Sequence, residues 1–247
     1  MNKRLIVLAA VLSVILSGCM FPSQERAGNE IAYKEQIESV QSAVDQYQES
    51  TGGLLPIKTV DNDTPIYRKY QIDFSMLKPR FMAELPGNAF ENGGVFQYTL
   101  LNVEEDPTVY VFDLRVAETI RTIQIRVQAN RGIPFKEQVG DNMYSIDYSK
   151  LGFDEDPTAV SPYTGNELPF VAGGDGTIYL DYMTDLYQLT QDQDLSAFQN
   201  EEDLRSILLE DSRVVPAYSV PYFVGEDGEI KYGREETGLN CALSSRQ

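Results

Sequence analysis

The sequence predicts an α+β protein in which two to three fused modules, each a helix followed by an antiparallel hairpin, form one globular unit. Three observations lead to this prediction. Apolar residues recur at helical spacing in segments that glycine and proline end. Short apolar runs typical of strands follow those segments and are separated by polar turns. Parts of this pattern repeat along the chain, and no proline- or serine-rich linker divides it.

The first predicted helix covers residues 32–50. Its residues that recur every three or four positions, and therefore share one face, are Ile37, Val40, Val44 and Tyr47. Gly52 and Gly53 end the helix, because glycine readily adopts the left-handed conformation of a C-terminal cap. A short helical turn at Phe74–Leu77 ends before Pro79. Strands are predicted at 95–101 and 108–114, joined by the polar turn 102–107 into an antiparallel hairpin.

The second predicted helix covers residues 117–129, where Ile120, Ile123 and Val127 have helical spacing. Ile123, Ile125 and Val127 also alternate, so a strand remains the alternative. Gly132 and Pro134 end this segment. A third helix is predicted at 201–210, with Asn200 as N-cap and Asp203 in the first turn. Its buried side would consist of Leu204, Ile207 and Leu208.

The segments that follow the helices resemble one another. The run Ile72-Asp73-Phe74-Ser75-x-Leu77 matches Ile146-Asp147-Tyr148-Ser149-x-Leu151, and residues 169–178 align with 221–230 with five of ten positions identical. Asp-Gly at 175–176 and 227–228 predicts type I′ hairpin turns, in which both central residues have positive φ. The predicted divisions of the chain are 1–18 (signal peptide), 19–31 (lipidated polar tether), 32–116 (first module), 117–195 (second module) and 196–247 (truncated third module and tail).

The N-terminal residues form a secretory signal. Lys3 and Arg4 precede an apolar run of twelve residues, Leu5 to Leu16, which is too short to span a bilayer as a helix. Leu16-Ser17-Gly18-Cys19 then follows the lipobox pattern, so the chain resembles the uncharacterised lipoproteins of Gram-positive bacteria. The resemblance implies a palmitate-bearing diacylglyceryl group on Cys19 and a cell-membrane, lipid-anchored, extracytoplasmic location. An ordinary cleaved signal peptide is the alternative, but no Ala-x-Ala site precedes Cys19.

Composition excludes several functions. The net charge is −18, and removal of Lys3 and Arg4 with the signal leaves −20, which repels nucleic acid. The chain has no histidine, the commonest general base and transition-metal ligand. Once Cys19 is lipidated, Cys241 has no intramolecular partner for a disulfide. No catalytic residue, transition-metal site or cofactor is predicted.

The acidic loops and the abundant tyrosines each allow a functional and a structural interpretation. Acidic residues cluster in several loops and suggest calcium binding, although none has the EF-hand spacing, and solvated loop acids are the alternative. These acids are Asp61, Asp63, Asp154, Glu155, Asp156, Asp192, Asp194, Asp175 and Asp227. The fifteen tyrosines suit protein recognition, but core packing is the better interpretation for those on apolar faces of strands.

Two loops have a further local resemblance. Residues 85–90 (Leu-Pro-Gly-Asn-Ala-Phe) and 161–170 (Ser-Pro-Tyr-Thr-Gly-Asn-Glu-Leu-Pro-Phe) resemble the loop of type II secretion pseudopilin heads, in which a helix precedes such a loop and a small antiparallel sheet. The likeness covers residues 32–101 and 117–182. A lipobox stands where a prepilin leader and a long apolar helix are required, so the resemblance implies a fold and not filament assembly.

The sequence therefore predicts a noncatalytic, membrane-anchored interaction or scaffold protein with an envelope protein as partner. The chain is not expected to be an enzyme. One alternative is a transporter's solute-binding lipoprotein, although alternating βαβ units are lacking. The other is a carboxylate-dependent hydrolase of envelope polymers, for which no pair of acids stands in a recognisable motif.

Overall fold

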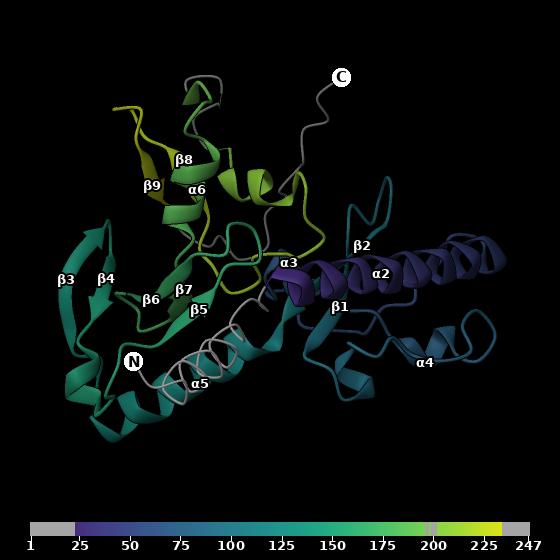
Figure 1. Cartoon of the computed structure of the whole chain (residues 1–247), viewed down its shortest axis with the longest axis horizontal. Coiled ribbons are helices and arrows are strands. Elements are labelled where there is room, and N and C mark those ends of the chain that lie inside the picture. The colour runs from purple at the N-terminus through teal and green to yellow at the C-terminus, as the bar shows by residue number, and fades with distance from the viewer. Residues whose placement is uncertain (1–22, 196–197, 199–201, 234–247) are drawn as a thin grey trace, which may run out of the picture.

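The computed structural model describes residues 23–195, 198 and 202–233, which form two lobes side by side (Figure 1). The first lobe comprises residues 23–113 and the second lobe the described residues from 114 to 233. The elements of the first lobe are α2 (Ser23–Thr51), α3 (Ile66–Lys69), α4 (Phe74–Leu77), η1 (Phe90–Asn92), β1 (Phe96–Leu101) and β2 (Thr108–Asp113). The elements of the second lobe are α5 (Leu114–Ala129), β3 (Phe135–Gly140), β4 (Met143–Ile146), η2 (Tyr148–Leu151), β5 (Thr158–Val160), β6 (Glu167–Gly173), β7 (Ile178–Leu180), α6 (Met183–Leu189), η4 (Leu204–Leu209), β8 (Tyr222–Val224) and β9 (Ile230–Tyr232).

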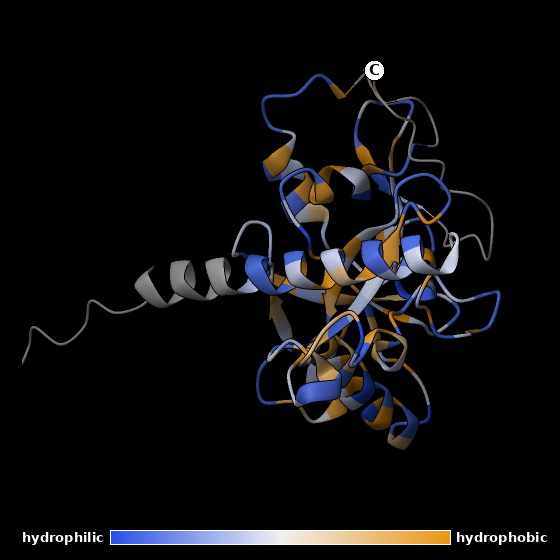
Figure 2. Ribbon diagram, turned by 90° about the vertical axis from the view of Figure 1, so that its right-hand side faces the viewer, coloured by the Kyte–Doolittle hydropathy of each residue, from blue (hydrophilic) through white to orange (hydrophobic). Residues whose placement is uncertain are grey.

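Helix α2 packs one face against the sheet of the first lobe. The residues of that face are Ile37, Val40, Ala43 and Val44, all buried, as the apolar spacing predicts. The side-chain amide of Gln41 holds the helix to the sheet. It donates to the carbonyl oxygen of Pro107 (2.9 Å) and accepts from the N–H of Val109 (2.7 Å). The opposite face of α2 is largely hydrophilic (Figure 2).

The sheet of the first lobe is completed by a segment of the second. Strands β1 and β2 pair antiparallel as predicted, and a bridge from Gln71 to Thr99 extends the sheet beyond β1. Beyond β2, residues 213–215 run parallel to the strand. The N–H of Val111 donates to the carbonyl oxygen of Arg213 (2.9 Å), and the N–H of Val215 donates to that of Val111 (2.8 Å). The two lobes therefore share a main-chain ladder.

Helix α5 begins the second lobe and runs along its lower side (Figure 1). Asp113 caps it by accepting from the N–H of Arg115 (2.8 Å). Ile123 is fully buried, whereas Ile125 is 57% exposed. A strand would place these two residues on one face, but a helix separates them. The helix prediction is therefore confirmed and the strand alternative is wrong.

These two isoleucines allow a direct test of the packing. We expect Ile123→Ala to lower the free energy of unfolding by ~2–5 kcal/mol, because it removes buried methyl groups and leaves a cavity. Ile125→Ala should change it by less than ~0.5 kcal/mol, because its side chain is mostly in water. Urea unfolding of both variants measures the difference. Equal effects at the two positions would contradict this packing.

The second lobe has an antiparallel sheet in the order β3-β4-β6-β5, with β7 also paired to β6. The hairpin β8-β9 packs against the same core, to which Tyr222, Val224 and Ile230 contribute. The fold is thus α+β, with helices on small open antiparallel sheets, as predicted. Within the described residues, no helix is both long and apolar enough to cross a membrane.

Two predicted elements differ in the structure. Helix α2 begins at Ser23, so its main chain runs through residues predicted to be a polar tether that precedes the helix. Those residues lack an apolar stripe, yet most are good helix formers. The predicted helix at 201–210 is instead the 3₁₀ segment η4, capped by Asp203, which accepts from the N–H of Arg205 (3.0 Å). Asn200, the predicted N-cap, lies outside the described residues.

The first pair of repeated motifs has the same local structure in both copies. Asp73 and Asp147 each accept from the serine two residues on, at 2.6 Å in both cases, and each precedes a helical turn.

The Asp-Gly hairpins also match each other, but they are not the predicted type I′ turns. The Gly176 N–H donates to the Gly173 carbonyl oxygen, and the Gly228 N–H donates to that of Gly225, both at 2.9 Å. Only the glycine of each Asp-Gly pair has positive φ, +90° at Gly176 and +78° at Gly228. Each aspartate accepts from the N–H two residues on, an arrangement that favours a type I turn followed by a glycine bulge.

Candidate functional site

A groove of about 350 Å³ lies where the lobes meet. Helix α3 of the first lobe forms one wall, α5 and β7 of the second lobe form others, and residues 217–219 close it. Its lining residues are Arg68, Ala117, Ile120, Gln124, Thr177, Ile178, Tyr179, Ala217, Tyr218 and Ser219. Pockets between structural units are common ligand sites, and this volume lies within their usual range. We therefore take this groove as the candidate functional site.

Arg68 is the cation of the groove. Its guanidinium stacks over the Tyr218 ring at 5.0 Å from the centroid. Its Nε is buried and has no hydrogen-bond acceptor, and among the described residues no carboxylate forms an ion pair with it. Burial raises the pKa of the Tyr218 hydroxyl, and the nearby Arg68 lowers it in part. The groove therefore holds one positive charge without an ionic partner.

The outer edge of β7 also faces the segment that closes the groove. The N–H of Leu180 donates to the carbonyl oxygen of Tyr218 (2.9 Å), on the side away from β6. Main-chain groups alternate in direction along a strand. The N–H and C=O of Ile178, two residues earlier, therefore point the same way as the N–H of Leu180.

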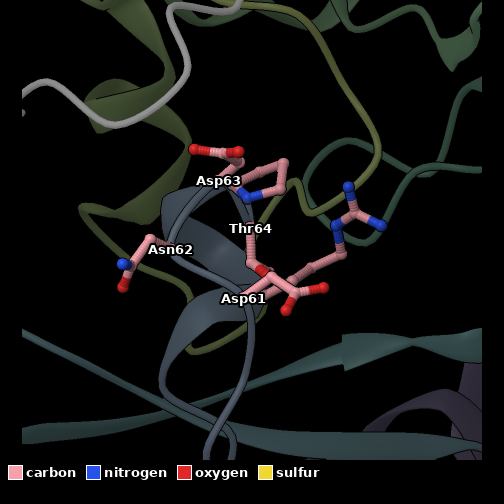
Figure 3. Close-up of a pocket in the computed structure, with 6 residues that line it drawn as sticks. Asp61, Asn62, Asp63 and Thr64 are labelled. Atoms are coloured by element: carbon pink, nitrogen blue, oxygen red, sulfur yellow. The ribbon is translucent and has the colours of Figure 1, made fainter.

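Arg68 also lines an open depression of about 560 Å³ beside residues 61–65 (Figure 3). This depression contains the first predicted calcium acids, Asp61 and Asp63. Their carboxylates point in different directions, and Asn62 points away from both (Figure 3). The loop therefore does not gather oxygen ligands around one point.

The other predicted calcium acids also form no metal-binding group among the described residues. Asp154, Glu155 and Asp156 are exposed. Asp175 and Asp227 serve their turns, and Asp227 also pairs with Lys231 at 2.7 Å. No group of three or more acidic or cysteine side chains suited to a metal occurs in the part of the chain that the structure describes. Calcium binding stays a prediction, with no preformed cluster to support it.

Two buried acids in the second lobe were missed by the sequence reasoning. Asp185 accepts from the Thr164 hydroxyl at 2.6 Å and from the Ser161 hydroxyl, and so holds the loop at 161–166. Asp181 accepts from the hydroxyls of Tyr232 (2.7 Å) and Tyr222 (3.1 Å). Neither acid stands in a motif, because their partners come from distant segments.

Asp181 gives a prediction about pH. Burial raises the pKa of this carboxyl, and its hydrogen bonds lower it only in part. A raised folded-state pKa gives stability that is full below the unfolded value, about 3.9, and is lost as the pH rises through the folded value. We expect wild type to lose stability relative to Asp181→Asn as the pH rises above about 4, the ordinary pKa of an aspartate in the unfolded chain. Urea unfolding across a series of pH values, with Asp154→Asn as the control for one lost charge, measures it. A difference in the free energy of unfolding between Asp181→Asn and wild type that does not change with pH would contradict a raised pKa at Asp181.

Most of the tyrosines are either buried in the core or partly buried and packed against it, which agrees with the core-packing interpretation. The fully or nearly fully buried ones are Tyr67, Tyr98, Tyr148, Tyr182 and Tyr222. The most exposed aromatic side chains are Phe90, Phe135 and Tyr187, at 59%, 43% and 47%. They lie on η1, β3 and α6, so the described surface has no single aromatic patch. Cys19, the predicted lipidation site, and Cys241 lie outside the described residues.

Comparison with known proteins gives one match. No curated protein and no solved structure matches the chain. A family model described as the YphF family N-terminal domain matches residues 33–113. The matched part contains α3 with Arg68, whereas α5, β7 and residues 217–219 of the groove lie beyond it. Nearly the whole first lobe is therefore similar to the YphF family N-terminal domain.

Proposed function

We propose that this protein is a noncatalytic, lipid-anchored binding protein on the extracytoplasmic face of the cell membrane, and that it holds an envelope protein through the groove between its lobes. The observation that carries the proposal is a groove at the lobe boundary in which Arg68 is the one cation among the described lining residues and has no ionic partner among the described residues. The lipobox at Leu16-Ser17-Gly18-Cys19 supports the anchor. The shared ladder between β2 and residues 213–215 supports a groove of fixed shape.

The anchor is tested by replacing its cysteine. We expect wild type to fractionate with membranes and its intact mass to include a diacylglyceryl group on Cys19. Cys19→Ser should abolish that mass and release the chain or leave it uncleaved. Cys241→Ser is the matched control and should leave both fractionation and lipid mass unchanged. A membrane-extracted wild type without added lipid would rule out the anchor.

The partner is tested by site-specific photocrosslinking in intact cells. A benzoylphenylalanine at Gln124, which lines the groove, should capture one dominant envelope protein. The same group at Ile125, on the exposed face of α5, should not capture it. Identical products from both positions would contradict binding in the groove.

Solute capture is the second candidate, because a groove of about 350 Å³ also fits a small ligand. Solute capture replaces envelope-protein binding as the proposed function if crosslinking gives no specific protein and the purified chain binds a small solute tightly. The two candidates therefore predict opposite outcomes.

A further inference from the structure

We propose that the groove between the lobes recognises the C-terminal carboxylate of an extended peptide that ends in an apolar residue, with Arg68 as the residue that binds the carboxylate. This inference rests on the proposed function and names the part of the partner that enters the groove. Three features carry it: the charge of Arg68, the apolar floor and the edge of β7.

Arg68 fits a carboxylate because its charge is otherwise unmatched. Several other described arginines also form no ion pair, but among the described residues Arg68 alone combines that with a buried guanidinium nitrogen that lacks a hydrogen-bond partner. A buried polar atom without a hydrogen bond is costly, and the Nε of Arg68 is such an atom. The planar guanidinium matches a carboxylate through two parallel hydrogen bonds. A bound carboxylate would thus give Arg68 an ionic partner and its Nε a hydrogen-bond acceptor.

The surroundings favour one negative charge over several. Among the described residues, Arg68 is the only cationic one that lines the groove. Asp61 and Asp63 line the adjoining depression, which Arg68 also lines, and would repel a dianion more strongly than a single negative charge. A phosphate or a nucleic-acid backbone is therefore a poor match, whereas a single carboxylate is a good one.

The floor of the groove is suited to an apolar side chain. Ile120 and Ile178 are buried core residues that reach the groove, and Ala117 and Ala217 leave space because their side chains are small. Removing an apolar side chain from water there is favourable, at ~25 cal/mol per Å² buried. The same groove therefore offers a place for the last side chain beside the place for its carboxylate.

The edge of β7 favours a peptide over an isolated acid. The main-chain groups of Ile178 point away from β6, toward the segment that closes the groove, and Leu180 already uses this direction to bind Tyr218. An extended peptide added at a strand edge gains main-chain hydrogen bonds, and the carboxylate fixes its register. An isolated small acid would use only Arg68 and the floor.

The test uses the full chain purified in detergent. The probe is an equimolar pool of fluorescein-labelled pentapeptides that end in Leu, Val or Phe with a free carboxylate, and the comparison is the same pool as C-terminal amides. Fluorescence polarisation should show binding of the acids and at least about tenfold weaker binding of the amides, since a charge-assisted hydrogen bond contributes about that much. Arg68→Gln should weaken binding of the acids to the level of the amides.

Arg80→Gln is the matched control. Arg80 also stacks on an aromatic ring, 5.1 Å from the Phe81 centroid, and lies outside the groove, so this variant should bind the acids as wild type does. Urea unfolding of Arg68→Gln and of Arg68→Lys shows whether each variant is folded, and Arg68→Lys should retain part of the binding because it keeps the charge.

Three outcomes of the binding assay would overturn the inference: equal binding of acids and amides, no binding of the pool to folded wild type, or binding of 4-methylpentanoate as tight as that of the peptides. The last would assign the groove to small acids. A crosslinked envelope partner that Arg68→Gln still binds would refute this inference and leave the proposed function standing.

Discussion

Arg205→Met is expected to lower the free energy of unfolding by ~3–5 kcal/mol, because it leaves a buried carboxylate without its partner. The Arg205 guanidinium lies 2.7 Å from the Asp203 carboxylate, and their side chains are only 6% and 14% exposed. The same guanidinium donates to the carbonyl oxygen of Ser219 (3.1 Å) and stacks at 4.9 Å over the ring of Tyr67. Arg205 thus joins η4, the segment that closes the groove and the first lobe.

A matched control exists at the start of α5. Asp113-Leu114-Arg115 has the same arrangement as Asp203-Leu204-Arg205, but the Arg115 side chain is 66% exposed. Arg115→Met should therefore cost less than ~1 kcal/mol. The double variant Asp203→Asn with Arg205→Met should recover part of the loss, because it removes the stranded charge. Urea unfolding of the four proteins measures these differences, and equal costs for the two arginines would refute the argument.

Gly94→Ala is the second substitution for which we expect a large effect, a loss of ~3 kcal/mol or more. A Cβ at Gly94 would lie 2.1 Å from the main-chain carbon and oxygen of Asn88. Asn88 cannot easily move, because its N–H donates to Gln36 on α2 (3.1 Å) and its side-chain oxygen accepts from the Tyr98 hydroxyl on β1 (2.7 Å). The clash is therefore transmitted to the core of the first lobe.

Substitutions at two other glycines of the same loop serve as controls that distinguish the steric clash at Gly94 from backbone strain. Gly93 has φ +85° and open space around its Cβ position, so Gly93→Ala should cost only the ~1–2 kcal/mol of a left-handed alanine. Gly87 has open space and no positive φ, so Gly87→Ala should be nearly neutral. Thermal or urea unfolding should rank them Gly94, Gly93, Gly87, and a Gly94→Ala protein as stable as Gly87→Ala would contradict the structure.

The sequence predicted the elements whose signals are local. The spacing of Ile37, Val40 and Val44 correctly identified α2 and its buried face, and the repeated motif at 72–77 and 146–151 correctly identified two equivalent turns. The prediction of type I′ turns was wrong. In each turn the aspartate side chain accepts a hydrogen bond from the N–H two residues later, and this contact outweighs the preference of Asp-Gly for a type I′ turn. The Asp-Leu-Arg motif occurs twice, at 113–115 and 203–205, but it was not identified from the sequence as a repeat.

The candidate site was not predictable in the same way. Arg68, Ile120, Ile178 and Tyr218 are separated by tens of residues, and each has an ordinary interpretation by itself. Their meeting depends on residues 213–215 joining β2, and no pattern in a single sequence indicates that a short segment pairs with a strand so far away. The buried acids Asp181 and Asp185 were missed for the same reason.

The ladder between β2 and residues 213–215 also sets the order of events when the chain folds. Residues 33–113 emerge first, but the outer edge of their sheet stays open until a segment about a hundred residues later arrives, which requires slow closure of a long loop. Until then β2 is a free edge to which another chain can add. The sheet of the lobe that is synthesised first is therefore completed last. A chain interrupted before residue 213 would keep β2 as an unpaired edge strand that is prone to aggregation.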